Sequence, residues 1–205
     1  MRIFSIDAAM ITRHRQTDTT RPIRDLAKWS RSIDPLAAPC QRLWLTRPGA
    51  LTAGLRELGQ LSLRVLRESI ARPAPDERLA MKLKPGASVR IREICMSIDG
   101  TDCVVARSAV DLQAWSGSWQ AMRSLGRRPL ADLLYDDSRV TRSPFETARL
   151  RLPHPLANLT RRAGMDRRSA YQYAHWARRS VFWRDGHALL VSECFLPGLW
   201  DFVCA

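Results

Sequence analysis

The sequence lacks the long apolar run of about 20 residues that a membrane-spanning helix needs. Its first residues, MRIFSIDAAMITRHRQ, contain only a short apolar stretch, which Asp7 interrupts. They show neither the apolar core nor the cleavage site of a signal peptide. We therefore expect a cytoplasmic protein without stable membrane insertion.

Cysteine is scarce and is not arranged for metal binding. The five cysteines form no C-x-x-C pair and no cluster with histidine. An odd number without metal spacing predicts reduced structural thiols, at Cys40, Cys95, Cys103, Cys194 and Cys204.

The common catalytic motifs are absent as well. The chain has no G-x-S-x-G, no phosphate-binding glycine loop, no dinucleotide fingerprint and no H-E-x-x-H. Its four histidines form no ligand pattern. These absences predict a protein without a metal and without a cofactor.

Lysine is nearly absent from a strongly basic chain. The net charge is +13, yet only three of the 33 basic residues are lysines. Basic proteins often bind nucleic acid, but here the arginines are scattered among acidic residues, and no zinc-finger or ribonucleoprotein motif accompanies them. We expect a solvated basic surface and no nucleic-acid partner.

What is present suits one domain with a real core, since the chain has 205 residues and 45% of them are apolar. Residues 1–27 are polar and aperiodic, which predicts a loose N-terminal extension. The domain then covers residues 28–205.

Alternation and turn signals predict an antiparallel sheet with short helices. Strand-like segments flank the Asp99-Gly100 and Asp185-Gly186 pairs, which suit two-residue type I′ hairpin turns. The LTAGLREL segment has leucines at helical spacing, and Gly59 ends that helix. The remaining predictions are a strand over 60–69, a loop at 73–77, short helices within 116–126 and 129–136, a strand within 140–152, and helix and loop over 153–175. This pattern is typical of an α+β fold.

The first hairpin places charges on an apolar face. A plain two-residue turn pairs Ile94 with Val105 and Arg92 with Arg107. Like charges opposite each other destabilise a sheet. Either an anion lies between the two arginines, or both side chains reach past the strand ends into water.

The second hairpin places Glu193 on one face with Val191 and Phe195, where an unpaired charge would be costly. The same register pairs Glu193 with Arg178. The two side chains form a structural ion pair, or Glu193 contacts a ligand, and a carboxylate has acceptor sites enough for both. Cys194 points to the opposite face and is not expected to act as a nucleophile.

Seven segments resemble, in order, the chorismate pyruvate-lyase family, which makes 4-hydroxybenzoate for ubiquinone. They are LWLTRPGALTAGL, IREICMSIDG, ARSAV, LGRRPLADLLY, VTR, WARRSVF and LLVSECFLP. Residues 1–27 have no counterpart in the compact members of that family, and the stretch of about 152–175 is longer than theirs.

The resemblance implies a sheet of about six antiparallel strands with helices forming flaps over an enclosed ligand. It implies conversion of chorismate to 4-hydroxybenzoate and pyruvate without a cofactor. We expect the protein to be a monomer. The family's ligand-binding arginine and glutamate correspond to Arg92 in IREI and Glu193 in SECFLP, which become the candidate catalytic residues. Its two binding backbone amides correspond to Leu51 and Leu130. Arg107 is a weaker candidate for holding the second carboxylate of chorismate.

Two other functions stay open. Effector-binding domains of some bacterial transcription regulators resemble the same fold, so a non-catalytic sensor of small aromatic acids is the first alternative. Such a regulator normally has a helix-turn-helix domain before this one, and residues 1–27 are too short for it. A nucleic-acid-binding module is the second, and a steep salt dependence of binding would reveal it.

Overall fold

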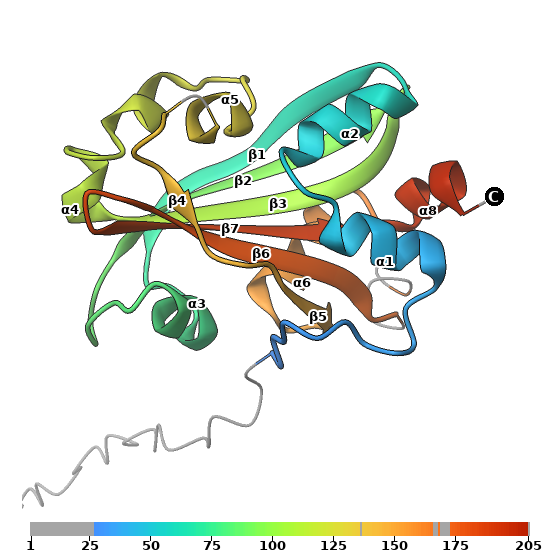
Figure 1. Ribbon diagram of the computed structural model, residues 1–205, viewed down its shortest axis with the longest axis horizontal. Helices are drawn as coiled ribbons and strands as arrows, with labels where there is room; N and C mark the ends of the chain where they lie inside the picture. Colours follow the sequence, from blue (N-terminus) through green and yellow to red (C-terminus); the bar gives the residue numbers. More distant parts are fainter. Residues whose placement is uncertain (1–26, 136, 166–167, 169–172, 205) are drawn as a thin grey trace, which may run out of the picture.

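The computed structural model describes residues 27–135, 137–165, 168 and 173–204 of the chain. Its centre is one antiparallel sheet of seven strands in the order β1-β2-β3-β7-β6-β4, with β5 also paired to β6 (Figure 1). The strands are β1 (Leu61–Ala71), β2 (Val89–Ile98), β3 (Thr101–Asp111), β4 (Thr141–Arg142), β5 (Glu146–Leu150), β6 (His175–Arg184) and β7 (His187–Phe195). The predicted α+β class is confirmed, with one strand more than expected. Of the predicted N-terminal extension, only residue 27 lies within the described residues.

Short helices connect these strands. They are α1 (Pro39–Thr46), α2 (Leu51–Leu58), α3 (Pro75–Ala80), α4 (Leu112–Trp115), η1 (Gln120–Ser124), α5 (Ala131–Leu134), α6 (Pro155–Arg162) and α8 (Pro197–Val203). The helix predicted to end at Gly59 is confirmed as α2. In the described part of the chain, no helix combines the length and the apolar character needed to cross a membrane.

The loop predicted at residues 73–77 is wrong, because its second half begins α3. Pro75 stands at the first helical position, where its fixed φ suits a helix and its missing N–H costs nothing. The side chain of Glu77 accepts a hydrogen bond from the backbone N–H of Ala74, at 2.8 Å. This backward contact satisfies a donor that would otherwise be free at the start of the helix.

Both predicted hairpin turns form, but only one predicted register is right. Asp99, Gly100, Asp185 and Gly186 all have positive φ, as type I′ turns require. In the second hairpin β6 and β7 pair as predicted, with Arg178 opposite Glu193.

In the first hairpin a bulge shifts the pairing of β2 with β3. Ser97 pairs with Asp102, but Met96 pairs with Val104, so one extra residue lies on β3. Beyond the bulge Arg92 pairs with Ser108 and not with Arg107. Because a one-residue slip moves a side chain to the other face, the bulge separates the two arginines that the plain turn would have placed together.

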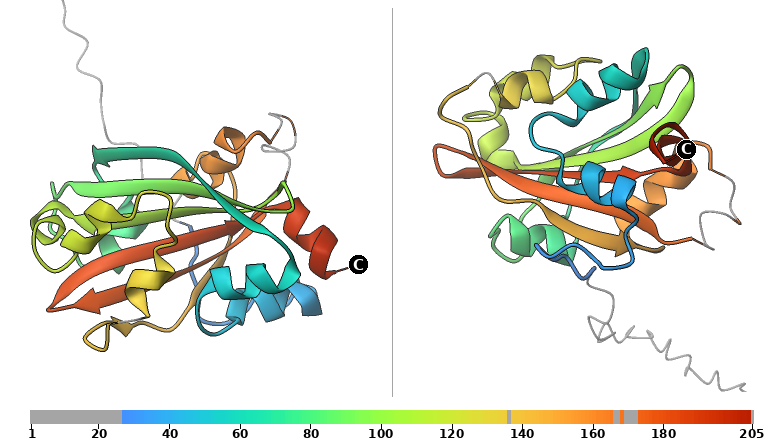
Figure 2. Two further views of the ribbon diagram at one scale, coloured as in Figure 1. Left: turned by 90° about the horizontal axis from the view of Figure 1, so that it is seen from above. Right: turned by 45° about the vertical axis from the view of Figure 1, so that its right-hand side comes forward.

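Helices cover both faces of the sheet. On one face, here called the cavity face, lie α1, α2, α5 and α8, and on the opposite face lie α3 and α6 (Figure 2). Two apolar clusters occupy the two ends of each face. On the cavity face one cluster packs under α1, α2 and α8 around Phe195, and the other packs under η1 and α5 around Trp119. A hollow between two such clusters is where a sheet can expose polar side chains without losing its core.

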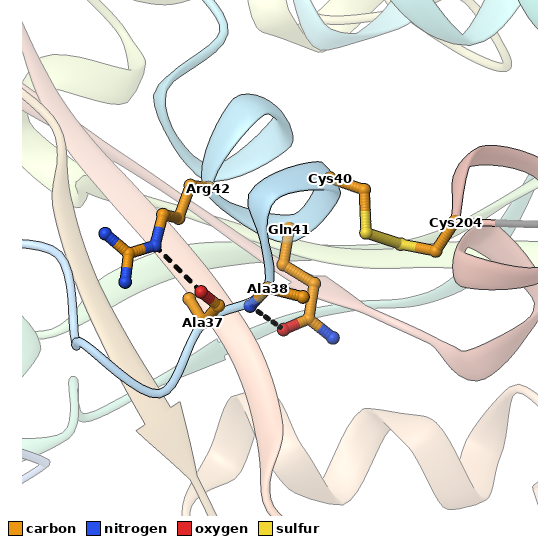
Figure 3. Close-up of a disulfide and its surroundings, with 6 residues drawn as sticks. All are labelled: Ala37, Ala38, Cys40, Gln41, Arg42 and Cys204. Atoms are coloured by element: carbon orange, nitrogen blue, oxygen red, sulfur yellow. Dashed lines mark hydrogen bonds between the residues drawn. A yellow bond between two sulfur atoms is a disulfide. The ribbon is translucent and has the colours of Figure 1, made fainter.

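The prediction that all cysteines are reduced is wrong. Cys40 in α1 and Cys204, just after α8, form a disulfide with a Cα–Cα distance of 5.6 Å (Figure 3). Sequence spacing did not reveal this pair, because 164 residues separate its members and only the fold brings them together. Cys95, Cys103 and Cys194 are free and buried.

Candidate active site

A cavity opens on the cavity face, between the sheet and the segments that begin α2 and α5. It holds about 690 Å³ of atom-free space, the solvent at its mouth included. Residues 49–52 and five residues between 129 and 135 line it from the helical side. The strands β1, β2, β3, β6 and β7 form its floor.

Two rows of cross-strand neighbours make most of this floor. Because paired residues of adjacent antiparallel strands point to the same side, each row crosses β2, β3, β7 and β6 on one face. The first row is Arg92, Ser108, Val191 and Ser180, and the second is Ile94, Ala106, Glu193 and Arg178. All eight residues line the cavity. The floor therefore has a cation at two diagonally opposite corners, Arg92 and Arg178, and Glu193 lies beside Arg178.

Arg92 occupies one corner as a buried cation whose hydrogen bonding is incomplete. Its side chain is 5% exposed. Nη2 donates to the carbonyl oxygens of Gly126 and Arg128, at 2.8 and 3.3 Å, while Nε has no acceptor among the described residues. Burial lowers the pKa of Arg92, against the opposing charge of Glu68, whose Oε1 lies 3.6 Å from Nε. A buried guanidinium with an unused N–H is suited to an anionic ligand.

Glu193 lies near the other corner and is paired with Arg178. Oε2 of Glu193 accepts a hydrogen bond from Nε of Arg178, at 2.6 Å. Arg178 is 1% exposed, and its Nη1 donates to the carbonyl oxygens of Trp44 and Arg47 at the end of α1. The predicted ion pair is confirmed. The carboxylate of Glu193 can still accept a hydrogen bond from a ligand, because its side chain is 15% exposed and lines the cavity.

The spacing of these corners limits the size of a ligand. The backbones of Arg92 and Glu193 are two strands apart, about 10 Å across the sheet. They are also offset by two residues along the strands, which is about 7 Å. Both residues line the cavity, as do Ile94 and Ala106. A small ligand between them would meet a cation at one end and a carboxylate at the other.

Leu51 and Leu130 both line the cavity, and both are at helix starts. Leu51 is the first residue of α2, and Leu130 directly precedes α5. The first N–H groups of a helix have no partner within the helix, so backbone amides are available at these two points. Their contact with a ligand remains a prediction.

Arg107, the weaker candidate, does not line the cavity. It is on the opposite face of the sheet, 7% exposed, between Glu77 and Glu93. Burial works to lower the pKa of Arg107, but hydrogen bonds and attraction from the two carboxylates outweigh it and raise the pKa. The β2–β3 bulge is the reason for this placement, so the prediction that Arg107 lies beside the ligand is wrong.

Several lining residues escaped the sequence reasoning. Ser180 stands two positions from Arg178, so strand alternation alone could have found it. Ser108 was hidden by the wrong register. Tyr135 and Phe145 lie outside regular strands and helices, where periodicity carries no information.

The donor set does not resemble a metal centre. In the ranges that the structure describes, three or more His, Cys, Asp or Glu side chains nowhere gather closely enough to hold a metal ion. Cys194 lies on the opposite face, as predicted, and complete burial raises the pKa of its thiol.

Comparison with known proteins agrees with the geometry. A family model described as "Chorismate lyase" matches residues 23–204. The chain belongs to the chorismate lyase family. A protein of Bordetella avium named probable chorismate pyruvate-lyase is 52% identical over 174 residues, which are 85% of this chain and 85% of the relative. A protein of Bordetella pertussis with the same name is 46% identical over 187 residues, covering 91% and 97% of the two chains. The resemblance read from seven short motifs is thereby confirmed.

Solved structures of low identity share the fold of this chorismate lyase family member. PhnF from Mycobacterium smegmatis has a TM-score of 0.52 at 14% identity, over 76% of this chain and 66% of PhnF. A GntR-family transcriptional regulator from Bacillus cereus has a TM-score of 0.51 at 9% identity, over 68% and 93%. At such identities the likeness concerns the fold alone.

Proposed function

We propose that this protein converts chorismate to 4-hydroxybenzoate and pyruvate, the step that supplies the aromatic ring for ubiquinone. The observation that carries the proposal is the placing of Arg92 and Glu193 at two ends of one cavity floor, in a chain of the chorismate lyase family. The ring of chorismate carries a carboxylate at one end and a hydroxyl at the opposite end. The two side chains match those two groups.

Arg92 binds the ring carboxylate by charge-assisted hydrogen bonds. Its Nη1, which donates to no acceptor among the described residues, is the donor that this contact would use, because Nη2 is engaged and Nε is fully buried near Glu68. Glu193 accepts a hydrogen bond from the ring hydroxyl, and Arg178 holds the carboxylate of Glu193 in place. The backbone amides of Leu51 and Leu130 add donors from the helical side.

The reaction needs no electrons from outside. The bond between the ring carbon and the enolpyruvyl oxygen breaks, and its electron pair forms the new carbonyl of pyruvate. The hydrogen on the hydroxyl-bearing ring carbon moves to the enolpyruvyl methylene, whose double bond supplies the electrons for the new C–H bond. The electrons of the broken ring C–H bond complete the aromatic ring. In the concerted form this hydrogen passes within the substrate, and in the assisted form Glu193 takes part in moving it.

Most of the acceleration then comes from holding a reactive conformer. Aromatisation drives the reaction downhill, so the enzyme has to bring the methylene next to the departing hydrogen. The start of α2 and the segment around α5 act as the flaps over the bound ring. They also keep water from the charged corners, which strengthens the contacts of Arg92 and Glu193.

The direct test is turnover by the purified full chain. Chorismate is added in buffer without metal or nucleotide, and 4-hydroxybenzoate and pyruvate are measured as they form in equal amounts. We expect turnover that a chelator does not reduce. Loss of activity with a chelator and recovery with a metal would contradict the cofactor-free proposal, and absence of both products would contradict the lyase proposal.

The same experiment decides the alternative function as a sensor. A sensor would bind chorismate or 4-hydroxybenzoate, measured by calorimetry, without consuming either. The regulators of similar fold do not decide the question, because they share the fold alone.

Three further properties complete the proposal. We expect a monomer, a domain that covers residues 28–205, and a cytoplasmic location. Sedimentation of the purified protein tests the first, and fractionation of cells tests the last. The Cys40–Cys204 disulfide makes the redox state of the protein in cells a useful part of the same measurement, because cytoplasmic thiols are usually kept reduced.

A further inference from the structure

The second carboxylate of chorismate has no partner in the site as described so far. Arg92 accounts for the carboxylate on the ring, and Arg107 lies on the other face of the sheet. The enolpyruvyl group carries the second carboxylate and is bonded to the ring carbon next to the one that bears the hydroxyl. If the hydroxyl contacts Glu193, this carboxylate must lie beside Glu193.

Arg178 is the nearest cation to that place. Its Nε and Nη1 are engaged with Glu193 and with two carbonyl oxygens of α1. A guanidinium has five N–H groups, and for Nη2 of Arg178 the described part of the chain offers no hydrogen-bond acceptor. Because Arg178 lines the cavity, Nη2 is a donor that a ligand beside Glu193 can use.

Arg142 in β4 provides a second cation at the same place. Its Nη1 donates to Oγ of Ser180, at 3.2 Å, and Ser180 lines the cavity next to Arg178. The guanidinium carbons of Arg142 and Arg178 lie 4.0 and 4.3 Å from the centre of one ring, that of Phe145, so both cations contact this ring, which also lines the cavity. Within the described ranges Arg142 has no carboxylate in salt-bridge distance.

Glu193 balances the charge of Arg178, but Arg142 has no such partner within the described ranges, so an anion bound between the two arginines would be attracted by both. Tyr135 also lines the cavity, and the charges of Arg142 and Arg178 act on its hydroxyl group. Burial and the charge of Glu193 raise the pKa of Tyr135, while Arg142 and Arg178 oppose that rise. Arg142 is thus close enough to the cavity for its charge to be felt there, although its own side chain is exposed.

We propose that Arg178 and Arg142 form a second anion subsite, which binds the carboxylate of the enolpyruvyl group and selects a dianionic substrate over a monoanion. The proposal rests on the proposed function. In the bound complex Arg92 holds the ring carboxylate, and the subsite holds the leaving group beside Glu193. The product 4-hydroxybenzoate has only the ring carboxylate and does not use the subsite. Substrate and product therefore differ in their dependence on Arg142.

The test compares Arg142→Gln with a matched control, Arg149→Gln. Arg149 in β5 is also exposed and also lies over an aromatic ring, that of Trp176 at 5.0 Å. Neither arginine lines the cavity itself, but Ser180 and Phe145, which Arg142 contacts, do line it, and Trp176 does not. Both variants lose one positive charge. For each, the steady-state constants for chorismate and the inhibition constant of 4-hydroxybenzoate are measured at fixed ionic strength.

For Arg142→Gln we expect KM for chorismate to rise about 5- to 20-fold, with the inhibition constant of 4-hydroxybenzoate changed less than about twofold. Arg149→Gln should change neither value. Arg142→Lys should recover part of the loss, because it restores the charge without the planar fork. Equal effects of Arg142→Gln on substrate and product, or equal effects of the two Gln variants, would overturn the subsite.

A failure of the proposed function is distinguishable from a failure of the subsite. If the wild-type protein forms no product, the lyase proposal is wrong, and binding is measured instead by calorimetry with chorismate and 4-hydroxybenzoate. The subsite then predicts that Arg142→Gln weakens the dianion and not the monoanion. An unchanged ratio of the two affinities would overturn it in that case as well.

Discussion

The two faces of the sheet both bury arginine, but they use it differently. Arg92 on the cavity face and Arg107 on the opposite face are 5% and 7% exposed, so burial does not distinguish them. Arg107 contacts Glu77 and Glu93, each at 2.6 Å. Arg92 contacts two carbonyl oxygens, and the nearest carboxylate in the described ranges, that of Glu68, is 3.6 Å away.

This difference separates a structural charge from a functional one. A buried cation with two carboxylates in direct contact is already neutralised, and its network extends further, since Glu93 also accepts from Arg162 at 2.6 Å. A buried cation with an unused N–H is incomplete without a ligand. Removal of the first should damage folding, and removal of the second should damage binding.

Arg107→Ala should have the largest effect on stability. It leaves Glu77 without a cation and Glu93 with Arg162 alone, and breaking a buried ion pair costs about 3–5 kcal/mol. Urea unfolding followed by tryptophan fluorescence measures the loss. The folded fraction should keep KM for chorismate near the wild-type value. A normal unfolding midpoint together with a raised KM would contradict the structural role.

Arg92→Ala should reverse this pattern. It removes the cation that binds the ring carboxylate of chorismate, which costs about 2–4 kcal/mol of transition-state binding. That is roughly a 30- to 1000-fold loss in kcat/KM. The unfolding midpoint should change much less than in Arg107→Ala. If both variants lose stability equally and keep normal kinetics, the distinction between the two faces fails.

The disulfide provides a separate test of the cavity face. Cys204→Ser should lower the free energy of unfolding by about 2–4 kcal/mol in oxidising buffer, because a long loop is no longer closed in the unfolded chain. Reduced wild-type protein is the matched control and should show no such difference from the variant. Turnover should stay normal in both. A fall in turnover would mean that the disulfide, through α1 and its carbonyl contacts with Arg178, also maintains the site.

Glu193→Gln should give a smaller and more informative change. It keeps the shape but replaces a charged hydrogen bond with a neutral one, at a cost of about 1–2 kcal/mol or roughly 5- to 30-fold in kcat/KM. A loss confined to kcat favours a part in moving the hydrogen, and a loss confined to KM favours orientation of the hydroxyl. Unchanged kinetics with a lowered melting temperature would mean that Glu193 only stabilises the fold, as the ion-pair partner of Arg178.

Sequence reasoning went furthest where local rules determine the structure. The Asp-Gly turns and the helix that ends at Gly59 follow from backbone preferences of single residues. The register of the second hairpin is set by its turn, so alternation placed Glu193 opposite Arg178 correctly.

It failed where distant parts of the chain decide. The bulge beside Met96 has no clear residue signature, yet it moved Arg107 to the other face. The disulfide joins residues that only the closed fold brings together. The contact of Arg142 with Ser180 depends on the pairing of β4 with β6 at the edge of the sheet. A strand of two residues is too short to show an alternating pattern in the sequence.

Truncation at the N-terminus should change the stability least, and it removes contacts only from the face of the sheet opposite the cavity. The family match begins at residue 23, so deletion of residues 1–22 should change the free energy of unfolding by less than about 0.5 kcal/mol. Deletion of residues 1–29 also removes Trp29, whose Nε1 donates to Oδ2 of Asp76 at 2.8 Å and whose ring lies 4.4 Å from the guanidinium of Arg179. That deletion should cost about 1–3 kcal/mol, because a buried carboxylate loses a donor. Both truncated proteins should keep the wild-type KM.

The cost of the longer deletion should also depend on pH. Burial works to raise the pKa of Asp76, but hydrogen bonds from His154 and Trp29 and the charge of Arg179 outweigh it and hold the pKa below its usual value. A carboxyl group with a lowered pKa in the folded state contributes stability above its unfolded pKa of about 4, and the contribution is lost as the pH falls through the folded value. The two truncated proteins should therefore differ in unfolding midpoint at pH 7, and the difference should begin to shrink as the pH falls below about 4 and disappear below the lower folded pKa of Asp76. A difference in unfolding midpoint that stays constant with pH would mean that Trp29 stabilises the protein by apolar packing alone. A loss of stability on deletion of residues 1–22 would show that residues before 23 also contribute to stability.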